Sequence, residues 1–416
     1  MTTANTRFAV VGVPGNRRVA LFRAAAARAG LPDPQVISWR DVLTGDGTPI
    51  APGSAVRVDS PGEDAEIDAL LRGPGDPTRT GGGAAWYEAF GTGLRHLAEA
   101  VEASPGSVLL GDPDEIAVMF DKRLCHARLR ADGVPVPPAL RESVGSYREL
   151  RELMTASGWP RVFVKPAHGS SASGVIAFQA LGARVRAVTS AALPDGRGEE
   201  RDGQSAAGHD AGGGRRENGG RGENGGRGEG GASLYNSLRV RTYENEADAA
   251  AVVDALAPDG LHVERWFPKA SMDGRAFDLR VVVVAGVPTH AVVRVGRTPM
   301  TNLHLGGARG DLGRVRERLG TAGWQGALDV CARAAACFPG SLAIGVDLMI
   351  GADWRSTAVA EVNAFGDLLP GLSGLPGSPG EDLDTYAAQI AAVSRGWRQG
   401  MQSRDIRGEG ETACVT

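Results

Sequence analysis

Three oxygen-bearing side chains, Asp347, Glu361 and Asn363, could bind a cation together. They lie in two apolar segments, residues 344–350 and 357–363, that are separated by a short turn and predict a β-hairpin. If the hairpin folds symmetrically about its turn, Asp347 faces Glu361 and Asn363 shares their side of the sheet. Carboxylates roughly 5 Å apart repel unless one is protonated or a cation joins them. An all-oxygen set favours Mg²⁺, Mn²⁺ or Ca²⁺; the alternative is an ordinary solvated face.

Two lysines also point to chemistry, because almost all the other basic residues of the chain are arginines. Lys165 ends a predicted strand and runs into a Gly- and Ser-rich loop, residues 168–174. Glycines let backbone N–H groups approach phosphate oxygens, and a lysine adds a point charge. Lys122 lies in a predicted turn and helix. The stretch around Glu264 is an apolar strand interrupted by charge, which could line an adenine slot or form an edge strand.

These residues must be positioned by a mixed α/β framework. In the first 111 residues short apolar strands alternate with helices, which predicts a parallel sheet. Strands are expected there at 8–13, 35–39, 55–59 and 108–110, and helices at 17–29, 65–71 and 84–103. Later strands are expected at 162–165, 174–179, 184–189, 238–242, 262–267, 278–285 and 289–295. Later helices are expected at 112–130, 147–157, 246–256, 312–319, 325–337 and 383–394.

Residues 194–232 differ from the rest of the chain, because Arg, Gly and Glu alternate there almost without apolar residues. Such a segment cannot bury enough surface to offset its ordering entropy, so we expect a disordered insertion. The predicted domain limits are therefore 1–111, 112–267 with this insertion, and 268–398, followed by a disordered tail, 399–416.

Composition limits the class of protein. A chain of 416 residues with 42% hydrophobic residues can build several cores, and its net charge of −4 gives no general attraction to nucleic acid or anionic membranes. The four cysteines lack zinc-type spacing, which favours a reduced, cytoplasmic compartment. No run of 18 apolar residues occurs, and the first apolar run resembles a strand more than a signal sequence. We expect no membrane segment.

The order of the motifs resembles the ATP-grasp superfamily, most closely its ribosomal-protein glutamate ligases and glutathione synthetases. The most specific matches are TNLHLGG at 301–307, GVDL at 345–348 and EVN at 361–363. Looser matches are DK at 121–122, the VKP and GSS motifs around Lys165, and DLRV at 278–281. The resemblance runs from residue 112 to 370. It implies an ATP-grasp fold, with an N-terminal open α/β domain and two further lobes that clamp ATP.

Carried over position by position, the resemblance also implies roles for single residues. The α- and β-phosphates would be bound by Lys122 and Lys165. The loop that closes over the γ-phosphate would contain His168, Gly169, Ser170, Ser171 and Gly174. The adenine hinge would contain Glu264, Arg265 and Phe267, with Lys269 or Asp273 at the ribose. Phosphoryl transfer would involve Arg280, Arg294 and Asn302, with His304 nearby. Two Mg²⁺ ions, or Mn²⁺, would be held by Asp347, Glu361 and Asn363.

The implied activity is ATP-dependent ligation of a carboxylate to an amine or thiol through an acyl phosphate, with release of ADP and phosphate. The substrates would be small molecules or peptides, and a homo-oligomer is compatible with the sequence. Two alternatives remain: a kinase that phosphorylates a hydroxyl, and an ATP-binding regulator without turnover. His168 and the segment 365–370 depart from the family pattern, and the N-terminal region does not reveal the substrate.

Overall fold

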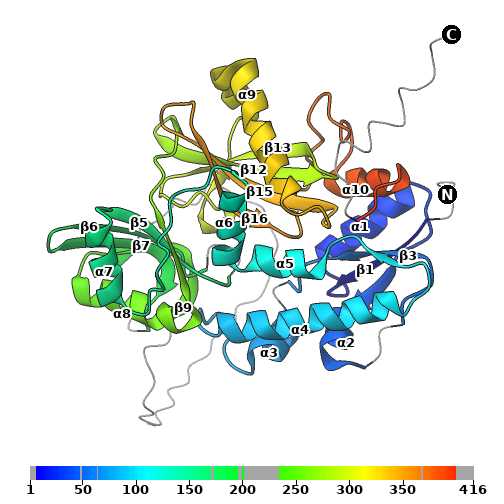
Figure 1. Ribbon diagram of the computed structural model, residues 1–416, viewed down its shortest axis with the longest axis horizontal. Coiled ribbons are helices and arrows are strands. Elements are labelled where there is room, and N and C mark those ends of the chain that lie inside the picture. The colour runs from blue at the N-terminus through cyan, green and yellow to red at the C-terminus, as the bar shows by residue number, and fades with distance from the viewer. Residues whose placement is uncertain are drawn as a thin grey trace, which may run out of the picture.

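The computed structural model describes residues 6–46, 49–62, 64–169, 173–194, 199–200, 234–366 and 369–399. Within them the chain forms three β-sheets with helices around and between them (Figure 1). Ser170 and Ser171, most of the expected insertion and nearly all of the expected tail lie outside the described residues. In the described part, no helix is both long and apolar enough to cross a membrane.

The N-terminal sheet has the strand order β2-β1-β3-β4, and every pair is parallel, as the alternation of strands and helices predicted. Its strands are β1 (Arg7–Gly12), β2 (Gln35–Ser38), β3 (Ser54–Val58) and β4 (Val108–Leu109). Its helices are α1 (Arg17–Arg28), α2 (Trp39–Thr44), α3 (Ala65–Arg72) and α4 (Gly83–Glu102). The strand expected at 35–39 ends one residue early, because the Ser38 side chain accepts a hydrogen bond from the Arg40 N–H and caps α2.

The second sheet is antiparallel throughout, in the order β10-β5-β6-β7-β9-β8. Its strands are β5 (Arg161–Pro166), β6 (Ile176–Leu181), β7 (Arg184–Ala192), β8 (Glu199–Glu200), β9 (Tyr235–Tyr243) and β10 (Leu261–Arg265). One face packs on α7 (Tyr147–Ala156) and α8 (Glu246–Leu256), which close a separate apolar core at the left of Figure 1. Strand β8 lies within the segment expected to be disordered, and it pairs with β9.

The third sheet is also antiparallel, in the order β14-β13-β12-β15-β16, with β11 paired to β12. Its strands are β11 (Ser271–Met272), β12 (Arg275–Val284), β13 (Val287–Gly296), β14 (Ala308–Arg309), β15 (Ala343–Ile350) and β16 (Thr357–Asn363). Helix α9 (Leu312–Ala336) covers its apolar face, which includes Phe277, Leu279, Val346 and Leu348. The two helices expected here form one run that is interrupted by non-helical backbone at Gly320.

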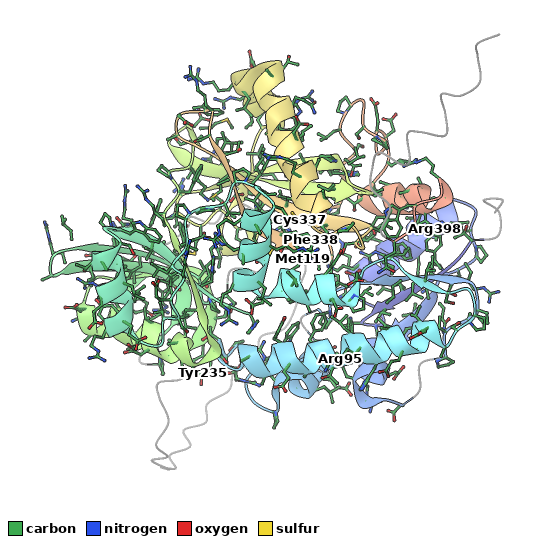
Figure 2. All side chains as sticks on the ribbon, in the orientation of Figure 1. Arg95, Met119, Tyr235, Cys337, Phe338 and Arg398 are labelled. Atoms are coloured by element: carbon green, nitrogen blue, oxygen red, sulfur yellow. The ribbon has the colours of Figure 1, made fainter. Side chains whose placement is uncertain are left out.

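Three shorter helices join these layers. The expected single helix at 112–130 is divided into α5 (Pro113–Phe120) and α6 (Lys122–Ala131), because Asp121 ends the first and caps the second. Met119 of α5 belongs to the same large apolar core as Cys337 and Phe338, which follow the end of α9; all three are labelled in Figure 2. Helix α10 (Thr385–Ser394) packs between α1 and the third sheet and joins the N-terminal sheet to it.

Candidate active site

One face of the third sheet carries a row of charged side chains. Asp278 and Arg280 of β12 point to the side opposite α9, because alternate residues of a strand share a face and Phe277 and Leu279 face the helix. The strand register then places Arg294 opposite Asp278, and Asp347 opposite Arg280. We call this side of the sheet the polar face.

The expected hairpin is present, and Asp347 lies directly opposite Glu361, with Asn363 opposite Gly345. A β-bulge makes this register possible. Leu348 pairs with Val359, so Ala360 is the extra residue that moves Glu361 into line with Asp347. The Ala360 carbonyl accepts a hydrogen bond from Lys165 Nζ at 3.2 Å. The bulge thus sets the carboxylate pair and also contacts the second sheet.

Asp347 is buried and is shared by the two arginines of the polar face. Arg280 donates to both carboxylate oxygens, with an Nη2–Oδ2 distance of 3.0 Å. Arg294 Nη2 also lies 3.0 Å from Asp347 Oδ2. Burial lowers the pKa of the Arg294 guanidinium, but Asp347 and Asp278 outweigh it and raise that pKa. Both arginines expected in phosphoryl transfer therefore meet at the first expected metal-binding carboxylate.

Asp278 is a second buried carboxylate between cations. It accepts hydrogen bonds from Arg294 Nε at 2.8 Å and from the Thr301 hydroxyl, and Lys269 Nζ lies 3.4 Å away. Burial raises the pKa of the Asp278 carboxyl, but Arg294 and Lys269 hold it well below its usual range. Burial also lowers the pKa of the Lys269 amine, against the opposing effect of Asp278. Asp278 thus fixes the direction of both cations.

The other two lysines reach this face from outside the sheet. Lys122, at the start of α6, lies 3.0 Å from Glu361 Oε1 and donates to the Gly169 carbonyl at 2.6 Å. Lys165, on β5, lies 2.5 Å from Glu264 Oε1. The sequence contains only three lysines among its 45 lysines and arginines. All three lie at this site. The ammonium group of lysine is a compact point charge, whereas the guanidinium of arginine is planar, so the two are not interchangeable there.

Glu264 belongs to the expected adenine hinge, but its carboxylate faces inward. It is 3% exposed and lies between Lys165 and His262, whose Nε2 is 3.4 Å from Glu264 Oε2. Burial alone raises the pKa of Glu264, yet Lys165 and His262 bring it down to about 2. The Arg265 N–H donates to the Pro138 carbonyl at 2.7 Å, and the Arg265 side chain is exposed. In the described residues the N–H of Phe267 makes no hydrogen bond.

The segment expected to cover the γ-phosphate begins at His168, whose side chain has two described partners. His168 Nε2 lies 3.0 Å from Asp121 Oδ2, and its ring stacks on Tyr87 of α4 with 4.1 Å between ring centroids. Asp121 also binds the Arg123 guanidinium and caps α6. Gly169 and Gly174 are at the two ends of the loop, and Gly174 has a positive φ of 68°. The loop is therefore anchored on its N-terminal side.

Asn302 lies in the loop between β13 and β14. Its carbonyl accepts hydrogen bonds from the N–H groups of Leu305 and Gly307, which turn the TNLHLGG motif back on itself. A Cβ at Gly307 would lie 2.7 Å from the Asn302 carbonyl oxygen, so only glycine fits. The His304 side chain lies outside the described residues. Asp273, the alternative ribose residue, instead pairs with Arg314 on the surface, 2.8 Å away.

The polar face carries oxygen donors that suit a divalent metal. No group of three His, Cys, Asp or Glu side chains occurs among the residues with described positions. The oxygen donors are instead two carboxylates, Asp347 and Glu361, and the Asn363 amide, whose nitrogen donates to the Gly345 carbonyl at 3.3 Å. Mg²⁺ is commonly bound by one or two carboxylates completed by phosphate oxygens and water. The donor set fits that ion.

Three residues near the site were not assigned a role from the sequence. Asp278 belongs to the DLRV motif and Tyr87 to a predicted helix, and neither pattern by itself predicts a role at the site. Arg309 of β14 lies opposite Arg294 in the sheet register and donates long hydrogen bonds, of 3.4 and 3.5 Å, to the Pro370 carbonyl. The Arg309 side chain is exposed and has no acidic partner within the described ranges. Motif order could have indicated Asp278, whereas Tyr87 and Arg309 required the tertiary structure.

No protein-family model and no curated protein sequence matches this chain. Solved structures do match in shape. A crystal structure of the D-cycloserine synthetase DcsG aligns over 93% of this chain and 98% of that chain, with a TM-score of 0.51 and 16% identity. The ATP-grasp ligase PsnB, in complex with a precursor peptide and AMPPNP, covers 94% and 98%, with a TM-score of 0.47 and 17% identity. At such identities the likeness concerns the fold, and this chain has the ATP-grasp fold.

Proposed function

We propose that the protein is an ATP-dependent ligase that joins a carboxylate to an amine, or to a thiol, through an acyl phosphate. The observation that supports this proposal is the polar face, where Asp347 and Glu361 lie in register beside Arg280 and Arg294. ATP carries about four negative charges near neutrality, and in-line phosphoryl transfer requires these charges to be neutralised and held in place. The residues gathered on this face meet that requirement.

The nucleotide would lie between the second and third sheets. Lys122 and Lys165 would bind the α- and β-phosphates, and the segment 168–174 would cover the γ-phosphate. Backbone N–H groups at the hinge would bind adenine, and the N–H of Phe267 is a suitable donor because it has no partner in the described chain. Lys269 would contact the ribose or a phosphate from its position beside Asp278.

Asp347, Glu361 and Asn363 would hold two Mg²⁺ ions, which neutralise phosphate charge when bound. Arg280, Arg294 and Asn302 would orient the transferred phosphoryl group. An oxygen of the substrate carboxylate attacks the γ-phosphorus and the bond to ADP breaks, which gives an acyl phosphate. The amine nitrogen then attacks the acyl carbon, phosphate leaves, and the amine proton passes to solvent. No side-chain nucleophile is required.

The substrates would enter beside the loop that follows β13. Arg309 supports this placement, because it extends the row of cations beyond Arg294 and donates to the Pro370 carbonyl. An exposed arginine that has no acidic partner among the described residues suits a carboxylate of the substrate. Both small molecules and peptides are candidate substrates.

The experiment is a screen of paired carboxylates and amines for release of ADP and phosphate. A ligase releases both in equal amounts, and only when both substrates are present, and Asp347→Ala abolishes the release. Release of AMP would refute the proposal. ADP without phosphate would indicate transfer to a hydroxyl, and ATP binding without turnover with any pair would favour a regulator.

A further inference from the structure

The cations and carboxylates of the polar face are paired with each other. Lys122 Nζ lies 3.0 Å from Glu361, and Arg294 Nη2 lies 3.0 Å from Asp347, which Arg280 also binds. These are the residues that the proposed function assigns to phosphate on one side and to metal on the other. The cations proposed to bind phosphate are therefore the counter-ions of the carboxylates proposed to bind metal.

The Arg294–Asp347 pair is buried, and the Lys122–Glu361 pair is partly buried, with side chains 11% and 31% exposed. Asp347 is 6% exposed and Arg294 is 7% exposed. Removing one partner from a buried pair is costly, because the remaining charge loses its compensation without regaining water. A nucleotide without metal would take the cations and leave Asp347 and Glu361 unpaired. A metal without nucleotide would take the carboxylates and leave the cations unpaired.

The space beside the pair is also small. A cavity of about 20 Å³ is lined by polar residues that include Lys122, His262 and Glu361 and by apolar residues that include Met119, Leu129 and Val359. That volume admits roughly one water molecule. The Lys122–Glu361 ion pair joins α6 to β16, and a ligand must separate the two side chains to enter between them.

We propose that this ion-pair network couples nucleotide binding to divalent-metal binding. The inference rests on the proposed function and goes beyond it. The nucleotide draws the cations away from the carboxylates, and the metal then supplies the positive charge that the carboxylates have lost. The two ligands therefore bind well only together. The coupling is a property of the protein's own side chains, in addition to the formation of a metal–ATP complex in solution. It predicts that loss of a metal-binding carboxylate strengthens the binding of ATP without metal.

The test measures ATP binding by isothermal titration in EDTA and, separately, in Mg²⁺. Glu361→Gln frees Lys122, so the Kd for ATP in EDTA is expected to fall about fivefold relative to the wild type, as expected for loss of roughly one such pair. The control is Glu317→Gln, which removes the same charge from the exposed side of α9. It should leave that Kd unchanged. In Mg²⁺ the Glu361→Gln protein should bind ATP more weakly than the wild type.

The reciprocal test uses Mn²⁺ alone, detected by electron paramagnetic resonance. Lys122→Met frees Glu361, so Mn²⁺ binding without nucleotide should become about fivefold tighter. An unchanged or weaker affinity in both variants would overturn the coupling. If Glu361→Gln fails to fold, as judged by circular dichroism, the Lys122→Met result decides alone. Failure of the wild type to bind ATP even with Mg²⁺ would instead refute the proposed function.

Discussion

Replacing Lys165 with methionine should reverse the pH dependence that Glu264 gives to the stability of the protein. In the wild type the Glu264 pKa is about 2, against an ordinary value of 4.5. A lowered pKa in the folded state stabilises the fold above the unfolded pKa, and this stabilisation is lost as the pH falls from 4.5 towards 2. The difference corresponds to about 3 kcal/mol at neutral pH.

Methionine keeps much of the lysine volume but removes the charge 2.5 Å from Glu264 Oε1. Burial raises the pKa of Glu264, and the variant lacks Lys165, the main group that lowers it. At pH 7 we expect a loss of about 3 kcal/mol, because a carboxylate remains buried without its cation. As the pH falls from 7 to 5, protonation of Glu264 relieves this cost, so the variant approaches the wild type.

The assay is urea unfolding at pH 7 and pH 5, followed by tryptophan fluorescence. Trp266 packs against Phe163 of β5, with 4.9 Å between ring centroids, and thus reports on this sheet. The double variant with Glu264→Gln should recover most of the lost stability at pH 7. Arg314→Met, which breaks an exposed ion pair, is the control and should leave the midpoint unchanged. An equal deficit at both pH values, or no recovery in the double variant, would refute the reasoning.

Three further predictions concern the site. Asp278→Asn leaves the cations around it without their shared carboxylate and should destabilise the fold by about 3 kcal/mol, measured by urea unfolding. Gly307→Ala would force a Cβ to within 2.7 Å of the Asn302 carbonyl, so ATP turnover should fall about 100-fold while circular dichroism is unchanged. Tyr87→Ala removes the stack on His168, the first residue of the proposed phosphate loop. ATP affinity should fall about fivefold, and Tyr87→Phe should restore it.

Local sequence was sufficient for the features that depend on neighbouring residues. The hairpin follows from alternating side chains and a short turn, and Asp347 lies opposite Glu361 as expected. The symmetric register was wrong nearer the turn, where Leu348 pairs with Val359, because a bulge at Ala360 shifts the pairing by one residue. The parallel N-terminal sheet likewise follows from the alternation of strands and helices. The sequence did not predict the division of the helix at Asp121. An aspartate inside a continuous helix and an aspartate that caps a second helix look alike in sequence.

The partners of the charged residues were decided by the tertiary structure. Lys165 meets Glu264 across one sheet and the carbonyl of Ala360 on another, and Lys122 reaches Glu361 from a helix. The energy of a buried charge depends on distance and desolvation, which only the packing of separate elements determines. Sequence alone indicated which residues carry charge and which side of a strand their side chains occupy. The folded chain determined that three lysines, separated by up to 147 positions, share one site.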